Sequence, residues 1–366
     1  MSNLRITLPV MMHFDAEIET FLAAKKRLEV LGEKTGVPLE VGAFIPFMPN
    51  HARKPENFEK QIKNQEKHKL PIWLVETGIY HTNAISYSPG NPTYDSSKPS
   101  DLERVIDQSA RLRDLDPTAP KNLIVAPHVG IFVLESLSKG DFSHPSLYSV
   151  PDFVGLRESL YRQTKENFAS LKTKATSLDL QLAIESSHLA AFENIWSWQK
   201  EERQPEMDYQ VFNDLSSLTE LSGGNIILDA NHLAVNRNVP GRFKANNYDP
   251  AALFATMSIN SWEEYVKKVG QVQDYLPHVH GLHISHVDGM GVKLKPGTEN
   301  GKLWGDGTGP DTTSAADYNL LLRTAQQRNW PVAIEQEFDL KPLTYQEADK
   351  FLEPVLKDYA RRVDSA

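Results

Sequence analysis

The chain has 366 residues, of which 40% are hydrophobic and 24% are charged, with a formal net charge of -9 and a pI near 5.8. This composition excludes a disordered chain, and the acidic balance excludes a broad phosphate-binding surface. The absence of cysteine excludes disulfides, thiol nucleophiles and zinc–thiolate sites, so oxygen and imidazole must supply the ligands of any metal ion.

Eight apolar runs that are typical of buried strands alternate with eight helical patterns. The expected strands are 4–12, 38–47, 71–79, 122–129, 180–185, 225–230, 279–286 and 330–336. The expected helices are Ala16–Leu31, Pro55–Lys69, Asp101–Leu112, Phe153–Ala175, Asp208–Leu221, Pro250–Tyr275, Ala315–Gln327 and Tyr345–Arg362. Strict alternation of eight units favours an α/β fold, a single (β/α)8 TIM barrel over residues 1–366, rather than an open doubly wound sheet.

The loops expected after the middle strands are long, and they lie on the face where such barrels carry out chemistry. They cover 81–100, 130–151, 186–207, 233–247 and 288–313. No export signal is expected, because the N-terminal apolar stretch is short and is followed by acidic residues. The longest apolar region is interrupted by Pro127 and His128, so we expect no membrane span and a cytoplasmic protein.

Four of the expected strands end on a side chain that can bind a metal ion. The segments LAIE, IILD, GLH and VAIE end on Glu185, Asp229, His283 and Glu335. Such a group at the exit of a strand buried on both faces needs a charge, a metal ion or solvent as its partner. Because the carboxyl ends of parallel strands meet at one end of a barrel, we expect one site. For each glutamate the alternative is an ion pair at the barrel rim.

His232 follows Asp229 by three residues in NIILDANHLAV. On an extended strand the two side chains would face opposite ways, so the chain must turn after Asp229 for both to converge. The pattern suits one metal ligand and one imidazole that binds substrate or supports the ligand. The alternative is that Asp229 caps the next turn and His232 packs beneath a loop.

The segment 278–289 is dense in histidine. We expect His283 to be the ligand, and His286 and Asp288 to bind substrate or a second ion. His278 and His280 lie at the strand entrance, where a structural role is expected.

Strands 3 and 4 end on Glu76 and His128, and His81 follows in GIYHTN. For each the choice between a site residue and a satisfied rim residue stays open. His128 is a candidate for substrate binding, and His81 with His128 are candidates for a second metal ion. The glycine-rich segment 296–310 resembles a lid. Its stretch GTENGKL does not match a phosphate loop, because the Ser or Thr that follows the lysine in that motif is missing.

This ordered set of residues resembles the xylose isomerase-like TIM barrel superfamily, which includes sugar isomerases and epimerases, inosose dehydratase and endonuclease IV (AP endonuclease family 2). The matching positions are Glu185, Asp229 with His232, His283 and Glu335. The resemblance implies one divalent ion, held by Glu185, Asp229, His283 and Glu335. It also implies that Glu185 and Glu335 move a proton through an enediolate. Hard oxygen ligands with one imidazole suit manganese, magnesium, zinc or cobalt.

The expectation is therefore an isomerase or epimerase of a sugar or related polyhydroxylated carbonyl compound. Strand 7 reads His283-Ile284-Ser285-His286, without the lysine of dehydratase-like members, which disfavours a dehydratase. An endonuclease IV-like phosphodiesterase and a metabolite-binding barrel without turnover also stay open, and a nucleic-acid partner is not expected. The sequence leaves the substrate and the oligomeric state open, a homo-oligomer included.

Overall fold

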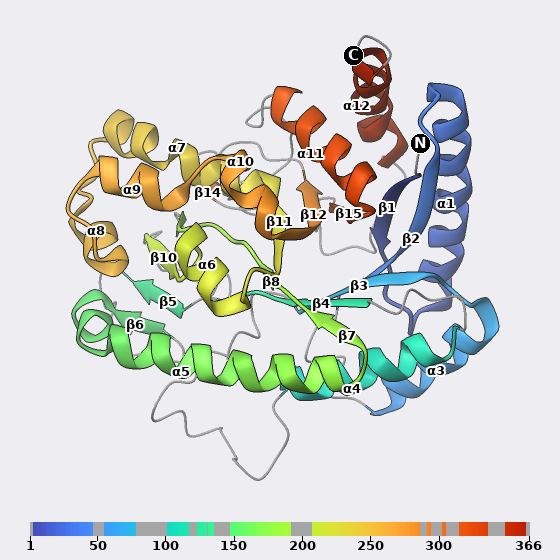
Figure 1. Ribbon diagram of the computed structural model, residues 1–366, viewed down its shortest axis with the longest axis horizontal. Helices are drawn as coiled ribbons and strands as arrows, with labels where there is room; N and C mark the ends of the chain where they lie inside the picture. The colour runs from blue at the N-terminus through green and yellow to red at the C-terminus, as the bar shows by residue number, and fades with distance from the viewer. Residues whose placement is uncertain are drawn as a thin grey trace.

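The computed structural model of the chain is a parallel barrel surrounded by helices (Figure 1). The structure describes residues 3–46, 55–77, 101–116, 123–129, 131–134, 147–191, 207–285, 291–293, 302–304, 315–335 and 348–363. The barrel strands are β1 (Leu4–Pro9), β2 (Leu39–Pro46), β3 (Ile72–Thr77), β4 (Leu123–Pro127), β7 (Leu180–Leu182), β8 (Ile184–Glu185), β11 (Ile226–Asp229), β12 (Val279–Ser285) and β15 (Pro331–Glu335). Every strand expected from the apolar runs is confirmed.

The sheet closes on itself through a strand that is split in two. The strand order is β7-β4-β3-β2-β1-β15-β12-β11-β8, and all of these pairs are parallel. Only Ala183 separates β7, which pairs with β4, from β8, which pairs with β11. The Ala183 N–H donates to Val125 O at 2.9 Å, and His128 forms an isolated parallel bridge with Glu185. The two ends of the sheet are therefore one strand, as the predicted (β/α)8 barrel requires.

The interior of the barrel is filled by a layer of side chains that come from the strands alone. This layer forms a buried cluster separate from the larger core between sheet and helices. Its members are Phe44, Leu74, Ile124, Ala126, Ala183, Ile227 and Ala333. At Gly281 a Cβ atom would lie 2.7 Å from Cδ1 of Ile227, so a larger residue at this point of β12 would force the Ile227 side chain to shift. The barrel is thus a packed core, with room for chemistry only above it.

The helices that cover the barrel agree with the sequence expectation in most places. They are α1 (Asp15–Thr35), α3 (Pro55–His68), α4 (Asp101–Asp114), α5 (Val150–Ser177), α6 (Leu215–Ser222), α7 (Ala230–Asn246), α8 (Ala251–Met257), α9 (Trp262–Val269), α10 (Val272–Tyr275), the 3-10 turn η3 (Leu276–His278), α11 (Ala315–Arg328) and α12 (Ala348–Val363). The first and last helices, α1 and α12, lie side by side, joined by Lys34 and Glu353 at 3.3 Å. No helix in the described part of the chain has the length and apolar character to cross a bilayer.

Three expectations about secondary structure are wrong. The expected loop 233–247 is the greater part of helix α7, which begins directly after Asp229. The expected helix Pro250–Tyr275 is broken, because Ser258 adopts a left-handed conformation with φ of 54° and Gly270 has a positive φ of 75° outside the helical region. The expected helix Asp208–Leu221 begins instead as a strand, β10 (Asp208–Val211), and becomes helical only at Leu215.

The long loops after the strands build two small sheets. The first has the order β6-β5-β10-β9, with β5 (Ile131–Leu134) and β6 (Leu147–Ser149) following β4, and β9 (Ala190–Ala191) following β8. The second pairs β13 (Gly291–Lys293) with β14 (Lys302–Trp304), which lies within the segment predicted as a lid. The described parts of these loops are therefore organised structure on the carboxyl-terminal side of the strands.

Candidate functional site

Ionisable side chains lie one layer above the packed interior, at the carboxyl ends of neighbouring strands. Side chains two residues apart on a strand point to the same face of the sheet. The residue two positions after each interior residue therefore points to the same side, one layer above. The pairs of interior and upper residues are Leu74 and Glu76, Ala126 and His128, Ala183 and Glu185, Ile227 and Asp229, and Gly281 and His283. The register agrees, since Asp229 pairs with His283 and Ser285 pairs with Glu335. Of the four residues expected to form one site, Glu185, Asp229 and His283 come together, and the side chain of Glu335 lies outside the described residues.

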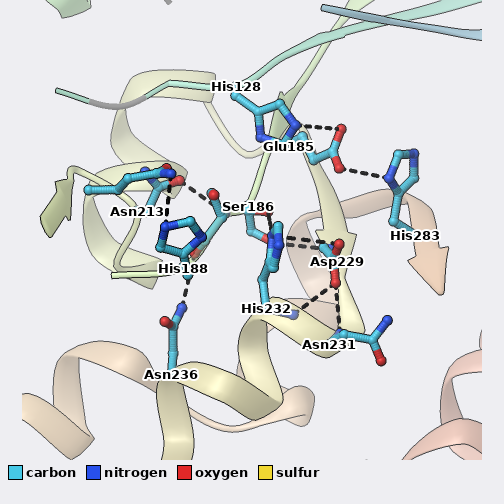
Figure 2. Close-up of polar contacts among 12 residues, drawn as sticks. His128, Glu185, Ser186, His188, Asn213, Asp229, Asn231, His232, Asn236 and His283 are labelled. Carbon is cyan, nitrogen blue, oxygen red and sulfur yellow. Dashed lines mark hydrogen bonds and ion pairs between the residues drawn. The ribbon is translucent and has the colours of Figure 1, made fainter. Parts of the chain in front are cut away.

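Glu185 is the centre of the cluster (Figure 2). It lies between two imidazoles, with its Oε1 2.7 Å from His283 Nδ1 and its Oε2 3.5 Å from His128 Nε2. Phe44 of the interior layer supports the His283 ring from below, with ring centroids 5.4 Å apart. Glu185, Asp229 and His283 are at most 1% exposed, and they offer ligand atoms that all lie within 4.8 Å of one another. These three residues form the candidate metal centre.

The two carboxylate oxygens of Asp229 have different surroundings. Its Oδ1 accepts the backbone N–H groups of Asn231 at 2.7 Å and His232 at 2.8 Å, and so caps α7. Its Oδ2 is buried and receives no hydrogen bond from the described residues, with His232 Nδ1 3.5 Å away. The predicted turn after Asp229 is this helix start. Capping, which the sequence offers as an alternative to ligation, leaves one oxygen of the carboxylate available to an ion.

His232 lies on the first turn of α7 and faces the segment that leaves β8. Its Nδ1 is 3.2 Å from Ser186 O, and a carbonyl can only accept, so Nδ1 carries a proton. Ser186 Oγ accepts the Asp229 N–H at 2.9 Å. The hydroxyl and carbonyl of one serine thus orient both members of the Asp-x-x-His pair.

A second cluster shares Glu185. Glu76, His128 and Glu185 are all buried and have ligand atoms within 4.8 Å of one another. His128 Nε2 is 3.2 Å from Glu76 Oε1. Burial lowers the pKa of His128, but the carboxylates of Glu185 and Glu76 outweigh it and raise that pKa overall. Glu76 and His128 are therefore buried beside Glu185, and their role in the site stays a prediction.

The charges of the site fit a divalent cation. Burial, and next the nearby carboxylate of Glu76, raise the pKa of Glu185, against the lowering effect of His128 and His283. Oε2 of Glu185, like Oδ2 of Asp229, is buried without a hydrogen-bond donor among the described residues. Buried carboxylate oxygens of this kind are costly unless a cation binds them. Two carboxylates and one imidazole are ligands that manganese, magnesium, zinc and cobalt accept.

Several residues that the sequence predicts in the site have side chains outside the described part of the chain. The backbone of Glu335 ends β15 beside Ser285, but its side chain lies outside the described residues, as do His81, His286 and Asp288. His278 and His280 lie at the amino-terminal end of β12, away from the carboxyl ends that carry the site. Their predicted structural role agrees with this position.

Sequence reasoning missed two buried asparagines, Asn213 and Asn236, which contact the segment after Glu185 (Figure 2). Asn236 follows His232 by four residues on α7, so both lie on one helix face, and this spacing is a signal that the sequence offers. Asn213 has no comparable signal. Its partners are Val129, which is 84 residues away, and Ser187, which is 26 residues away.

No protein-family model matches the chain, and no curated protein matches it. Solved structures do resemble it in shape. A protein described as a xylose isomerase, from Rhodospirillum rubrum, has a TM-score of 0.49 at 12% identity, covering 98% of this chain and 99% of its own. The 3-keto-D-glucoside 4-epimerase of E. coli has a TM-score of 0.47 at 12% identity, covering 96% and 98%. A xylose isomerase-like TIM barrel protein from Mycobacterium smegmatis, in complex with magnesium, has a TM-score of 0.44 at 13% identity, covering 97% of each chain. The TIM barrel itself is established by the strand order and register of this chain.

Proposed function

We propose that the protein is a divalent-metal-dependent isomerase or epimerase of a sugar or a related polyhydroxylated carbonyl compound. The observation that carries the proposal is the buried cluster of Glu185, Asp229 and His283 at the carboxyl ends of adjacent strands. The order of these residues along the chain is the order on which the resemblance to sugar isomerases and epimerases rests. The substrate is a small molecule with a carbonyl and neighbouring hydroxyl groups.

Glu185, Asp229 and His283 would hold the ion, with Glu335 as a proposed fourth ligand. A bound divalent ion polarises a carbonyl and an adjacent hydroxyl and so lowers the cost of removing the proton on carbon. Glu185 is the proposed proton carrier on one face of the substrate, and burial raises its pKa, which suits a group that takes up and returns a proton. Glu335 is the proposed carrier on the other face. His232 is the proposed substrate-binding imidazole, oriented by the contact of its Nδ1 with Ser186 O.

The test is proton exchange between substrate and solvent. Protein reconstituted with manganese is incubated with a panel of ketoses in D2O, and deuterium on carbon is measured by NMR and mass spectrometry. Glu185→Gln should abolish the incorporation. The matched control is Glu220→Gln, because Glu220 pairs with Lys165 and Tyr161 on the outer helices and should leave incorporation unchanged. Incorporation at the wild-type rate in Glu185→Gln would contradict the assigned role.

A second candidate function is a metal-dependent phosphodiesterase that uses two ions. The observation that favours it is the cluster of Glu76, His128 and Glu185, which shares Glu185 with the first cluster, as in sites where two ions act on one phosphate. In that case the protein should cleave DNA at abasic sites, and His128→Ala should remove cleavage. Absence of cleavage at high protein concentration, with manganese or zinc present, would reject this function.

A further inference from the structure

The segment that follows Glu185 leaves the barrel as an irregular stretch of chain, from Ser186 to Leu189, that is buried throughout. A buried backbone outside a helix or sheet must find other partners for its N–H and C=O groups. At Ser186 the barrel still supplies one, since its N–H donates to Ile227 O at 3.0 Å. Beyond Ser186 the N–H of Gln210 donates to Leu189 O at 3.2 Å, and side chains of two asparagines bond the other backbone groups described next.

Asn236 holds the segment from the side of α7. Its Nδ2 donates to Ser187 O at 3.0 Å, and its Oδ1 accepts the N–H of Leu189 at 2.7 Å. His232 lies one turn earlier on the same helix face and bonds Ser186 O. The backbone carbonyl of Asn236 accepts a hydrogen bond from the hydroxyl of Tyr265, which is fully buried. One face of α7 therefore bonds three backbone groups of the segment, namely Ser186 O, Ser187 O and Leu189 N–H.

Asn213 holds the same segment from the opposite side. It lies between β10 and α6 and is 1% exposed. Its Oδ1 accepts the N–H of Ser187 at 3.1 Å, and its Nδ2 donates to Val129 O at 2.6 Å. Val129 follows His128, and Ser187 comes two residues after Glu185, so this one amide joins the exits of β4 and β8.

The segment also supports the imidazole ring of His232. The rings of His188 and His232 meet edge to face, with centroids 5.6 Å apart. Gln210 of β10 lies 3.1 Å from His188 Nε2. A shift of residues 186–189 would therefore displace the packing of His232 as well as its hydrogen bond.

We propose that Asn213 and Asn236 are positioning residues of the metal centre. They fix the backbone of residues 187–189, and thereby Ser186, whose hydroxyl and carbonyl orient Asp229 and His232. The inference rests on the proposed metal-dependent function, because the groups that it positions are those of the proposed metal centre. Neither asparagine is proposed to touch the ion or the substrate.

The experiment compares Asn236→Ala and Asn213→Ala with a matched control, Gln65→Ala. Gln65 is also a buried amide that bonds backbone groups, donating to Leu70 O at 2.9 Å and accepting Leu70 N–H at 3.1 Å, but it lies before β3 at the other end of the barrel. The dissociation constant for Mn²⁺ is measured by calorimetry, and thermal unfolding of the metal-free proteins is measured beside it. Asn236→Ser and Asn213→Ser serve in place of an alanine variant that does not fold.

All three variants should unfold at a lower temperature, but only the asparagine variants should bind Mn²⁺ more weakly, by about tenfold or more, as other groups that orient metal ligands do. Unchanged Mn²⁺ affinity in both asparagine variants, at the same loss of stability as Gln65→Ala, would overturn the proposal and leave them a purely structural role.

A second readout separates this inference from the proposed function. In protein labelled with ¹⁵N in histidine, the ring signals of the metal-free wild type should show His232 protonated at Nδ1. Those signals should change in Asn236→Ala and stay the same in Gln65→Ala. If the wild type binds no Mn²⁺ the proposed function fails, yet a change in the His232 signals still supports the positioning role. Identical His232 signals in wild type and Asn236→Ala would overturn it.

Discussion

The two oxygens of Asp229 give a prediction that separates metal binding from helix capping. Asparagine caps a helix about as well as aspartate, so Asp229→Asn should keep the acceptor for the N–H groups of Asn231 and His232. It replaces the charged Oδ2, which receives no hydrogen bond from the described residues, with a neutral amide. Unfolding free energy of the metal-free protein should therefore be unchanged or higher, because the cap is kept and a buried carboxylate oxygen without a hydrogen bond becomes a neutral group. Mn²⁺ affinity should fall by more than about 100-fold, beyond the loss caused by groups that only support a ligand.

Asp229→Ala removes both functions and should in addition lower the unfolding free energy by about 1 kcal/mol, the usual cost of a lost helix cap. Urea unfolding followed by circular dichroism gives the stability, and calorimetry gives the Mn²⁺ affinity. Ser261→Ala is the control, because Ser261 caps α9 through Glu264 N–H at 3.2 Å and should cost stability without weakening Mn²⁺ binding. The reasoning is refuted if Asp229→Asn binds Mn²⁺ like the wild type, or if it loses as much stability as Asp229→Ala.

Two further predictions concern the barrel below the site. Gly281→Ala should destabilise the protein by about 1–3 kcal/mol, because the added Cβ would overlap Cδ1 of Ile227. Ile227→Val removes that Cδ1 atom, so the double variant should recover part of the lost stability in urea unfolding. Additive effects of the two changes on the unfolding free energy would contradict the contact. Burial lowers the pKa of His280 below its ordinary 6.5, with Arg328 and Lys172 adding to the effect. Its contribution to stability is therefore complete above pH 6.5 and is lost as pH falls through the lowered pKa. The melting temperature of the wild type should fall more steeply on acidification below pH 6.5 than that of His280→Asn, and equal slopes would argue against it.

The period-two pattern of the strands made most of the barrel and the positions of the candidate ligands predictable. Each candidate ligand stands two residues beyond an interior residue of its strand, so an apolar run that ends on Glu185 or Asp229 indicates both the strand and the direction of the side chain. Glu76 and His128 follow the same rule. Their role stayed open because one ionisable residue after an apolar run is also common at a rim.

Helix α7 escaped prediction because its first turns are buried on every side. Residues from Ala230 to Asn236 are all buried, so the sequence lacks the polar face that reveals an amphipathic helix. The helix also contains Pro240, which usually indicates a helix end. Asn213 could not be found for another reason, since its hydrogen bonds join segments that only the folded chain brings together.

Metal content shows whether Glu185, Asp229 and His283 hold a divalent ion. Wild type, His283→Ala and the control His278→Ala are purified without chelating resin, reconstituted with manganese, magnesium, zinc or cobalt, and analysed by plasma mass spectrometry. His278 lies before β12 at the opposite end of the strand, so its loss should not matter. The account predicts about one ion per chain in the wild type and in His278→Ala, and a loss of that ion in His283→Ala. A wild type that binds no ion after reconstitution, or a His283→Ala variant that keeps the full content, would contradict it.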